Sequence, residues 1–299
     1  MDKGVSMANA PGHRFGQIIG EMLEEILTQK LQTFCDERGL FLDKKGPRGK
    51  VRRTKKVRRI DSHGNSHDLD FVIEKGGSLN DYGRPVAFIE AAWRAKTKHS
   101  RAKAQEIQGA VLPIAETFHW DSPFLGAILA GVFTNGALEQ MKTNGFRVTL
   151  FPAETIRSAL SSVGIKITFG DDTPDADFLR SIDQYSALPR VKHEELKQHI
   201  VNNNQKLIDQ FLAQLQNTLD RQIDQIILIP LHGNQNEFRT VVDAISFVNN
   251  FQEDVFRDGG FRKYEIIVRY TNNDKIDASF QSKANAIAFL HHIERGVIA

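Results

Sequence analysis

The chain has little of what several classes of protein require. A single cysteine, Cys35, among 299 residues excludes an intrachain disulfide and a zinc site built on cysteine pairs. The sequence has no run of about 18 apolar residues, and its first residues lack the apolar stretch of a signal peptide. We therefore expect a soluble cytoplasmic protein that does not contact a membrane.

Several catalytic motifs are also missing. The sequence has no Walker-type glycine loop, no G-x-S-x-G elbow and no dinucleotide-binding fingerprint, which disfavours nucleotide-driven motion and covalent serine chemistry. His63 and His67 lie near a turn without an acidic or thiol partner at ligand spacing, so zinc is not expected there. With 40% hydrophobic and 25% charged residues, the chain should fold as a globular core with a smaller second module.

Positive charge is concentrated in one segment. Ten of the sixteen residues from 44 to 59 are Lys or Arg, and none is acidic. Because the whole chain sums to only +2, the rest of it is net acidic and the positive field is local. Such a run is more often a solvated surface, but its strength and its lack of acids favour nucleic-acid contact. The expected contacts are Arg48, Lys50, Arg52, Arg53, Lys55 and Lys56.

Apolar spacing and turn residues predict an alternation of helices and strands. In the first part we expect a helix over 14–38, strands at 51–60, 69–74 and 85–92 as a three-stranded meander, a helix over 100–118, strands at 124–133 and 147–151, a helix over 154–163 and a strand at 165–169. After an acidic break at 171–177 we expect a helix over 193–221, a strand at 226–231, a helix over 236–256, strands at 263–270 and 275–280 and a helix over 282–294.

Two acidic residues stand out in the predicted strands. Asp70 opens one strand, and Glu90 lies in the next one between apolar residues, where an acid is rarely buried without a partner. Two carboxylates on adjacent strands can hold a divalent cation against a phosphodiester. The acids of the first helix, Glu21, Glu24 and Glu25, are expected on a solvated face.

The α-β-β-β-α-β order, with Asp70 opening one strand and Glu90 near the end of the next, resembles the PD-(D/E)XK nuclease superfamily, which includes many restriction endonucleases. The resemblance covers about residues 13–170. It implies an α/β fold with a restriction endonuclease-like core, in which a mixed central sheet is flanked by helices. It also implies that Asp70 and Glu90 bind Mg²⁺, which polarises the scissile phosphate and lowers the pKa of an attacking water.

The chain departs from the family pattern at two positions. Leu69 stands where the family usually has Pro, and Ala92 stands where it has the Lys that orients or activates the water. Some family members carry a replacement on the following helix, for which Lys103 is our first candidate and Arg94, Lys96 and Lys98 are others. By the same resemblance Glu106 is a third metal-binding acid, and Glu21, Glu24 and Glu25 resemble the Glu that some members direct toward the metal from the first helix, although a solvated face is the first expectation for them. Lys98 and Arg101 are further expected nucleic-acid contacts.

Together these features predict a Mg²⁺-dependent DNA endonuclease of restriction or phage-defence type. The nuclease core is expected at 13–175, and a C-terminal α+β module for dimerisation or DNA recognition at 190–299. Cutting both strands of double-stranded DNA takes two sites, so a homodimer is expected. The alternatives are a catalytically silent nucleic-acid-binding protein on the same fold, marked by Ala92, and an assembly protein whose basic segment meets an acidic partner.

Overall fold

The computed structural model describes residues 10–168, 170, 172–231, 234–253 and 262–297. The chain forms two compact units: unit 1 comprises residues up to Thr117 and Phe124–Gln214, and unit 2 comprises Phe118–Pro123 and the residues from Leu215 onward. The boundary expected between residues 175 and 190 therefore lies near Gln214, inside a long helix. That helix belongs to unit 1 over most of its length because its apolar side packs on the first sheet.

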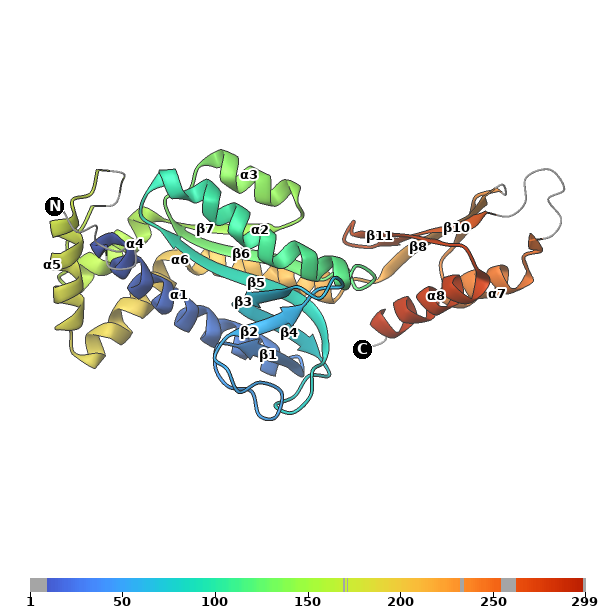
Figure 1. Ribbon diagram of the computed structural model, residues 1–299, viewed down its shortest axis with the longest axis horizontal. Coiled ribbons are helices and arrows are strands. Elements are labelled where there is room, and N and C mark those ends of the chain that lie inside the picture. The colour runs from blue at the N-terminus through green and yellow to red at the C-terminus, as the bar shows by residue number, and fades with distance from the viewer. Residues whose placement is uncertain (1–9, 169, 171, 232–233, 254–261, 298–299) are drawn as a thin grey trace. The chain divides into compact units, whose positions relative to one another are not determined.

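Unit 1 is built on a mixed sheet in the order β1-β4-β5-β6-β7 (Figure 1). Its elements are α1 (Pro11–Asp36), β1 (Leu40–Lys44), β2 (Val57–Ile60), β3 (Ser66–Leu69), β4 (Phe71–Lys75), β5 (Arg84–Arg94), η2 (Thr97–His99), α2 (Ser100–Thr117), β6 (Phe124–Gly131), α3 (Asn135–Thr143), β7 (Arg147–Pro152), α4 (Ala153–Ser162), α5 (Asp175–Ser186) and most of α6 (Arg190–Leu219). β1, β4 and β5 pair antiparallel, whereas β5, β6 and β7 pair parallel.

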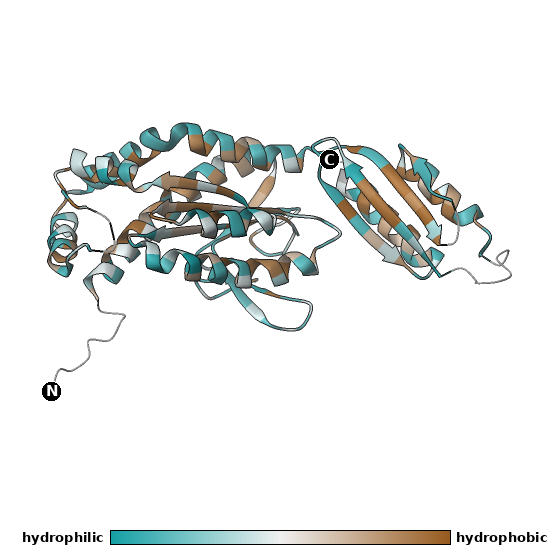
Figure 2. Cartoon of the chain, turned by 90° about the horizontal axis from the view of Figure 1, so that it is seen from above, coloured by the Kyte–Doolittle hydropathy of each residue, from teal (hydrophilic) through white to brown (hydrophobic). Residues whose placement is uncertain are grey.

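Helices cover both faces of this sheet, which confirms the predicted α/β class. α1 and α6 lie on the face that carries Trp93: a Cβ at Gly16 would lie 3.6 Å from the Trp93 ring. α6 approaches β6 so closely that a Cβ at Gly126 would lie 2.7 Å from Phe211, so this position requires glycine. α2 lies on the other side in Figure 1. Burial on both faces explains why β6 has no polar side chain, and Figure 2 shows hydrophobic brown along strands inside unit 1.

Some predicted elements of unit 1 are different in the structure. The main sheet has β1 as its edge strand, whereas β2 and β3 form a separate hairpin, so the predicted meander of 51–60 with the next two strands is wrong. Residues 165–168 form no strand, and Phe169 lies outside the described residues. The acidic break runs into α5, because Pro174 and the acids that follow it suit the first turn of a helix.

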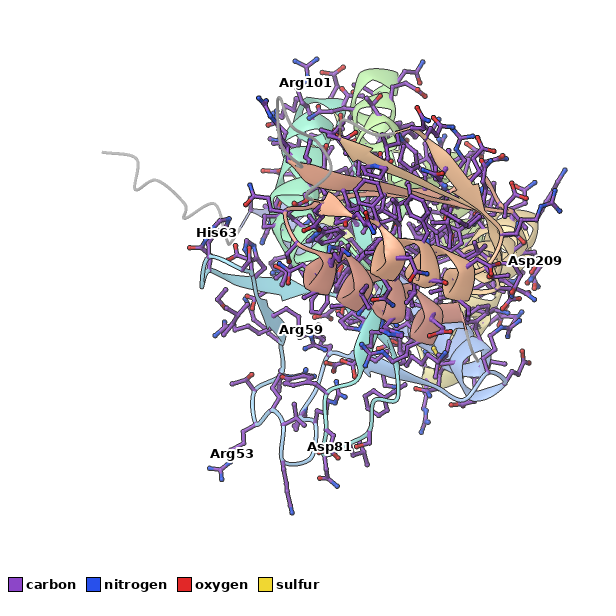
Figure 3. All side chains as sticks on the ribbon, turned by 90° about the vertical axis from the view of Figure 1, so that its right-hand side faces the viewer. Arg53, Arg59, His63, Asp81, Arg101 and Asp209 are labelled. Atoms are coloured by element: carbon purple, nitrogen blue, oxygen red, sulfur yellow. The ribbon has the colours of Figure 1, made fainter. Side chains whose placement is uncertain are left out.

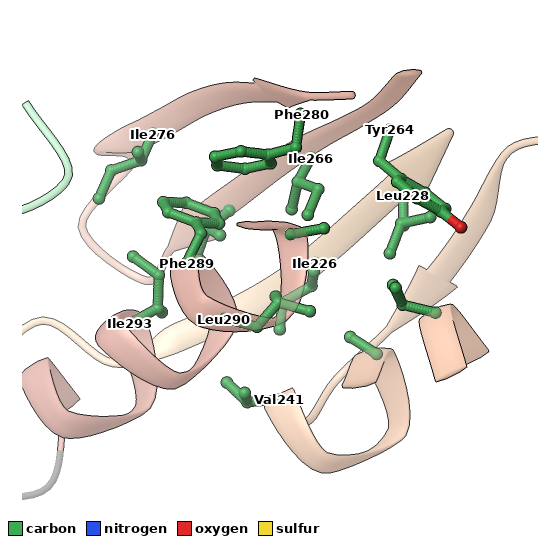
Figure 4. Packing of buried hydrophobic residues seen from close by; sticks show 14 of the residues in the cluster. Ile226, Leu228, Val241, Tyr264, Ile266, Ile276, Phe280, Phe289, Leu290 and Ile293 are labelled. Atoms are coloured by element: carbon green, nitrogen blue, oxygen red, sulfur yellow. The ribbon is translucent and has the colours of Figure 1, made fainter. Parts of the chain in front are cut away.

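Unit 2 is a four-stranded antiparallel sheet, ordered β11-β10-β8-β9, with helices packed on it, which gives the expected α+β module. Its elements are β8 (Ile223–Leu231), β9 (Asn236–Phe238), α7 (Val241–Asn250), β10 (Lys263–Tyr270), β11 (Lys275–Phe280) and α8 (Lys283–Val297). Figure 4 shows its core, where Ile226, Ile266 and Phe280 of the strands meet Phe289 and Leu290 of α8.

The helix predicted over 236–256 is shorter than expected. Asn236–Phe238 pairs with β8 as a strand, and α7 begins only after Thr240, whose hydroxyl accepts a hydrogen bond from the Asp243 amide as an N-cap. Residues 254–256 lie outside the described part. Among the described residues, no helix is both long and apolar enough to cross a membrane.

Candidate active site

Two acidic side chains meet in unit 1, one from each of two paired strands. Asp70 lies between β3 and β4, and Glu90 lies in β5. β4 pairs antiparallel with β5 in a register that sets Phe71 opposite Ile89, and the next step of this register sets Asp70 beside Glu90. Phe71 and Ile89 are buried and anchor both strands at this point. The structure therefore brings the two predicted acids together.

The two residues are interlocked through their backbones. The Asp70 amide donates a hydrogen bond of 3.0 Å to Oε1 of Glu90, and the Ala91 amide donates one of 2.8 Å to Oδ2 of Asp70. The two side chains lie close enough for each to shift the pKa of the other. A proton on one carboxyl group would let the two share a hydrogen bond. The two backbone hydrogen bonds therefore hold the acids together at one point of the sheet.

Burial gives this pair unusual proton affinity. Burial raises the pKa of Glu90 well above its ordinary value, and the nearby charge of Asp70 raises it further. Burial also raises the pKa of Asp70, which the hydrogen bond from the Ala91 amide and the charge of Lys103 partly offset. Two carboxylates held this closely do not both ionise easily unless a positive charge joins them.

Of the proposed replacements for the missing lysine, Lys103 is the one whose charge acts on both acids. Its Nζ donates a 2.7 Å hydrogen bond to Oε1 of Glu106, one helical turn away on α2. Arg94 lies 3.9 Å from the same carboxylate. Glu106 is 64% exposed and binds these two cations, so the structure does not bring it into the Asp70–Glu90 pair as a third acid.

A cavity of about 930 Å³ lies between α1, the end of β5 and the start of α2, and its lining includes Ala91, whose amide binds Asp70. This volume is within the range of small-ligand sites. Its lining includes Gly16, Gly20 and Glu24 from α1, Lys45 just after β1, Ala91, Ala92 and Arg94 from β5, and Lys98, Lys103 and Glu106 from the segment that follows β5. Polar and charged side chains of both signs therefore converge on the space next to the two acids.

Glu24 and Lys45 also line this cavity. Glu24 was expected first on a solvated face, with a metal-directed role as the alternative, and Lys45 was expected only as one cation of the basic run. Lys45 donates a 3.1 Å hydrogen bond to Oε2 of Glu24. Burial raises the pKa of Glu24, the hydrogen bond from Lys45 offsets part of this, and the charge of Asp70 adds to it. The sequence does contain a sign of this cavity: Gly16, Gly20 and Glu24 are spaced four residues apart and form a non-apolar stripe along one side of α1.

The structure divides the predicted nucleic-acid contacts. Arg48 and Arg52 are only 2% and 7% exposed, and their guanidinium groups bind Asp43 and Glu74 in the interior. The positions of these two arginines do not suit contact with nucleic acid, because Asp43 and Glu74 neutralise their charge inside the fold. Lys50, Arg53, Lys55 and Lys56 are exposed, and Lys56 also pairs with Asp68 at 2.6 Å.

Lys98 and Arg101, the two other predicted contacts, are exposed, Lys98 in η2 and Arg101 at the start of α2. Lys98 lines the cavity. Figure 3 shows that Arg101 lies far from Arg53, at the opposite end of the view. Lys45 is thus the cation of the basic run that lines the cavity, whereas exposed Arg53 lies far from Arg101.

Comparisons with known proteins leave the family of this chain open. No protein-family model and no curated protein matches it. A crystal structure of a protein of unknown function, AF1548, aligns with 62% of this chain and 97% of its own, at 10% identity and a TM-score of 0.29. A likeness this low carries no argument about fold or function.

Proposed function

We propose that this protein is a Mg²⁺-dependent DNA endonuclease of the PD-(D/E)XK type, of a restriction or phage-defence system. The observation that carries the proposal is the pair of half-buried Asp70 and buried Glu90, which adjacent strands hold together near an open cavity. Two acids whose pKa values are raised by burial and by each other suit a site where a cation joins them.

The donor set fits Mg²⁺. Asp70 and Glu90 offer carboxylate oxygens, which Mg²⁺ prefers, and Mg²⁺ usually keeps several waters. Within the described residues, no group of three or more His, Cys, Asp or Glu side chains is arranged to hold a metal, so two protein carboxylates form the proposed set. When bound, the ion would polarise the scissile phosphate and lower the pKa of the attacking water.

The remaining side chains have separate roles in this proposal. Lys103, held by Glu106, acts on the attacking water or on the phosphate in place of the lysine missing at position 92. Arg94 and Lys98 line the same cavity and bind the flanking phosphates. Cutting a duplex takes two such sites, so the active form is a homodimer.

The first test is cleavage of unmethylated phage and plasmid DNA by the purified protein, in Mg²⁺, Mn²⁺ or EDTA. We expect discrete fragments that depend on the divalent cation. Fragments that form equally well in EDTA would contradict the proposed metal site.

Lys103→Met is expected to slow cleavage by about a hundredfold, since a positioned group of this kind typically contributes that much or more. The matched control is Lys142→Met, because Lys142 forms the same kind of one-turn ion pair with Glu139 on α3, at 2.8 Å. Single-turnover cleavage rates measure both. Equal rates for the two variants would remove Lys103 from the site.

The alternative is a DNA-binding protein without catalysis on the same fold. Ala92 favours it, and so does the ion pair between Lys103 and Glu106, which engages the best replacement for the missing lysine. This alternative predicts salt-dependent DNA binding with no cleavage in either metal. Ala92→Lys tests it directly: Ala92 lines the cavity on the strand face that carries Glu90, so a lysine there would reach the same space.

A further inference from the structure

Two loops of unit 1, residues 45–56 and 76–83, are joined into a single lobe, which we call the basic lobe. Arg48 links them, because its Nε donates a 2.9 Å hydrogen bond to the Ser78 carbonyl and its Nη2 donates one of 2.8 Å to the Asp81 carbonyl. Gly49 has a positive φ of 39°, and a Cβ there would lie 2.2 Å from the Leu79 carbonyl oxygen. Figure 3 shows Arg53 and Asp81 on these adjacent loops.

An arginine cluster, made of Arg48, Arg52 and Arg59 with Asp43 and Glu74, lies under the lobe. Arg48 binds Glu74 at 2.7 Å and Asp43 at 2.8 Å, and Arg52 binds Asp43 at 2.9 Å. Arg59 binds both acids. All five side chains are at most 10% exposed. They hold the lobe in one conformation and are not available to a ligand.

The outer surface of the lobe combines positive charge with an exposed apolar side chain. Lys50, Arg53 and Lys55 are exposed on the first loop. Leu79 on the second loop is 62% exposed, and Tyr82 is 52% exposed. Arg59 stacks on the Tyr82 ring at 4.3 Å, which fixes the ring from below. The outer surface of the lobe therefore presents leucine and three cations on loops that the arginine cluster holds in place.

We propose that the basic lobe binds double-stranded DNA, with Lys50, Arg53 and Lys55 on the phosphates and Leu79 inserted between base pairs from the minor groove. Apolar side chains of this kind unstack base steps, and flanking cations hold the backbone. A lobe already fixed by the arginine cluster loses little conformational entropy on binding. This inference rests on the proposed function, since it names the surface that holds the substrate, but it does not involve Asp70 or Glu90.

The test is binding of the full chain to a labelled duplex in EDTA, where no cleavage can interfere, over a range of salt concentrations. Lys50→Gln, Arg53→Gln and Lys55→Gln together are expected to weaken binding at least tenfold and to reduce the salt slope by about 2 to 3, because each phosphate contact contributes about 0.9. The control is Lys142→Gln, Lys166→Gln and Lys206→Gln, which removes equal charge from exposed positions elsewhere in unit 1 and should leave both values unchanged.

Leu79→Ser separates insertion from charge. In a duplex that contains 2-aminopurine, the fluorescence rise that accompanies base unstacking should appear with the unaltered protein and disappear with Leu79→Ser, while the salt slope stays the same. The control is Val191→Ser, at another exposed apolar residue that is 75% exposed on α6. If the triple lobe variant does not fold, Arg53→Gln alone is expected to lower the salt slope by about one.

The outcomes distinguish this inference from the proposed function. If DNA is cleaved but the triple lobe variant binds it as tightly as the unaltered protein, the lobe proposal is overturned and the nuclease proposal stands. Tighter binding to duplex RNA or to polyglutamate than to DNA overturns the lobe proposal as well. If the unaltered protein binds no DNA at low salt, both proposals are overturned.

Discussion

Replacing Glu90 by Gln is expected to slow cleavage by about a thousandfold, because a catalytic cation supplies several kcal/mol and about 1.4 kcal/mol is a factor of ten. The amide keeps the acceptor for the Asp70 backbone, which lies 3.0 Å from Oε1, but has no negative charge to hold Mg²⁺. Asp70→Asn should have the same effect for the same reason. Single-turnover cleavage in Mg²⁺ measures the loss.

The same substitution should make the metal-free protein more stable at neutral pH. The folded pKa of Glu90 lies well above its ordinary value, so folding favours the protonated acid. Below the pKa of Glu90 in the unfolded chain, about 4.3, Glu90 is protonated in both states and its ionisation costs no stability. As the pH rises from there toward the folded pKa, Glu90 ionises in the unfolded chain but stays protonated in the folded one, which lowers the free energy of unfolding. Glu90→Gln removes this loss. We expect a gain of about 0.5–2 kcal/mol near pH 7, or several degrees in Tm, that vanishes near pH 4.

Two controls make this prediction specific to the acid pair. Glu74→Gln changes another buried acid, but one that is fully paired with arginines, so it should destabilise the protein at pH 7. Added Mg²⁺ should raise the Tm of the unaltered protein and leave that of Glu90→Gln unchanged, because a ligand stabilises only the state that binds it. A lower Tm for metal-free Glu90→Gln at pH 7, or an equal response of both proteins to Mg²⁺, would contradict the account of this pair.

Most of the fold could be predicted from local patterns. In α1 apolar residues recur at helical spacing, and in β6 they form a continuous run. Both patterns follow from burial of these elements, so both elements lie close to their predicted bounds. The hairpin of β2 and β3 could not be recognised in this way. Its pairing, which sets Val57 opposite Leu69, depends on a partner 12 residues away rather than on the pattern of the basic run.

The candidate site was predictable to the extent that it depends on adjacent strands. Asp70 and Glu90 meet because a hairpin register joins them, and an acid among apolar residues signals a buried partner. Glu24 approaches Asp70 from a helix distant in sequence, and only tertiary packing decides which side of α1 faces the cavity. Arg48 likewise finds Glu74 across 26 residues, so a run that looks uniformly basic contains both buried and exposed arginines.

Replacing Arg48 by Met is expected to destabilise unit 1 by about 3–5 kcal/mol, because removal of one partner from a buried ion cluster leaves its acids uncompensated. Arg48 is 2% exposed and binds both Glu74 and Asp43, and it also holds the carbonyls of Ser78 and Asp81. Methionine fills a similar length without charge, so the loss reports the ion pairs and hydrogen bonds rather than a cavity. Urea unfolding followed by circular dichroism measures it.

The matched control is Arg53→Met, five residues along the same loop, where the side chain is exposed and the change in the free energy of unfolding should stay within about 0.5 kcal/mol.

The two variants should also differ in the pH at which they unfold in acid. Burial raises the pKa of Asp43, but hydrogen bonds from Arg52 and Arg59 outweigh it and hold the pKa below its ordinary value. The stability that Asp43 contributes is therefore present above the unfolded pKa of about 3.9 and is lost as the pH falls through the lower folded value. Loss of Arg48 weakens this cluster, so Arg48→Met should unfold in acid at a higher pH than Arg53→Met. Equal acid midpoints for the two variants would show that the arginine cluster does not hold the basic lobe.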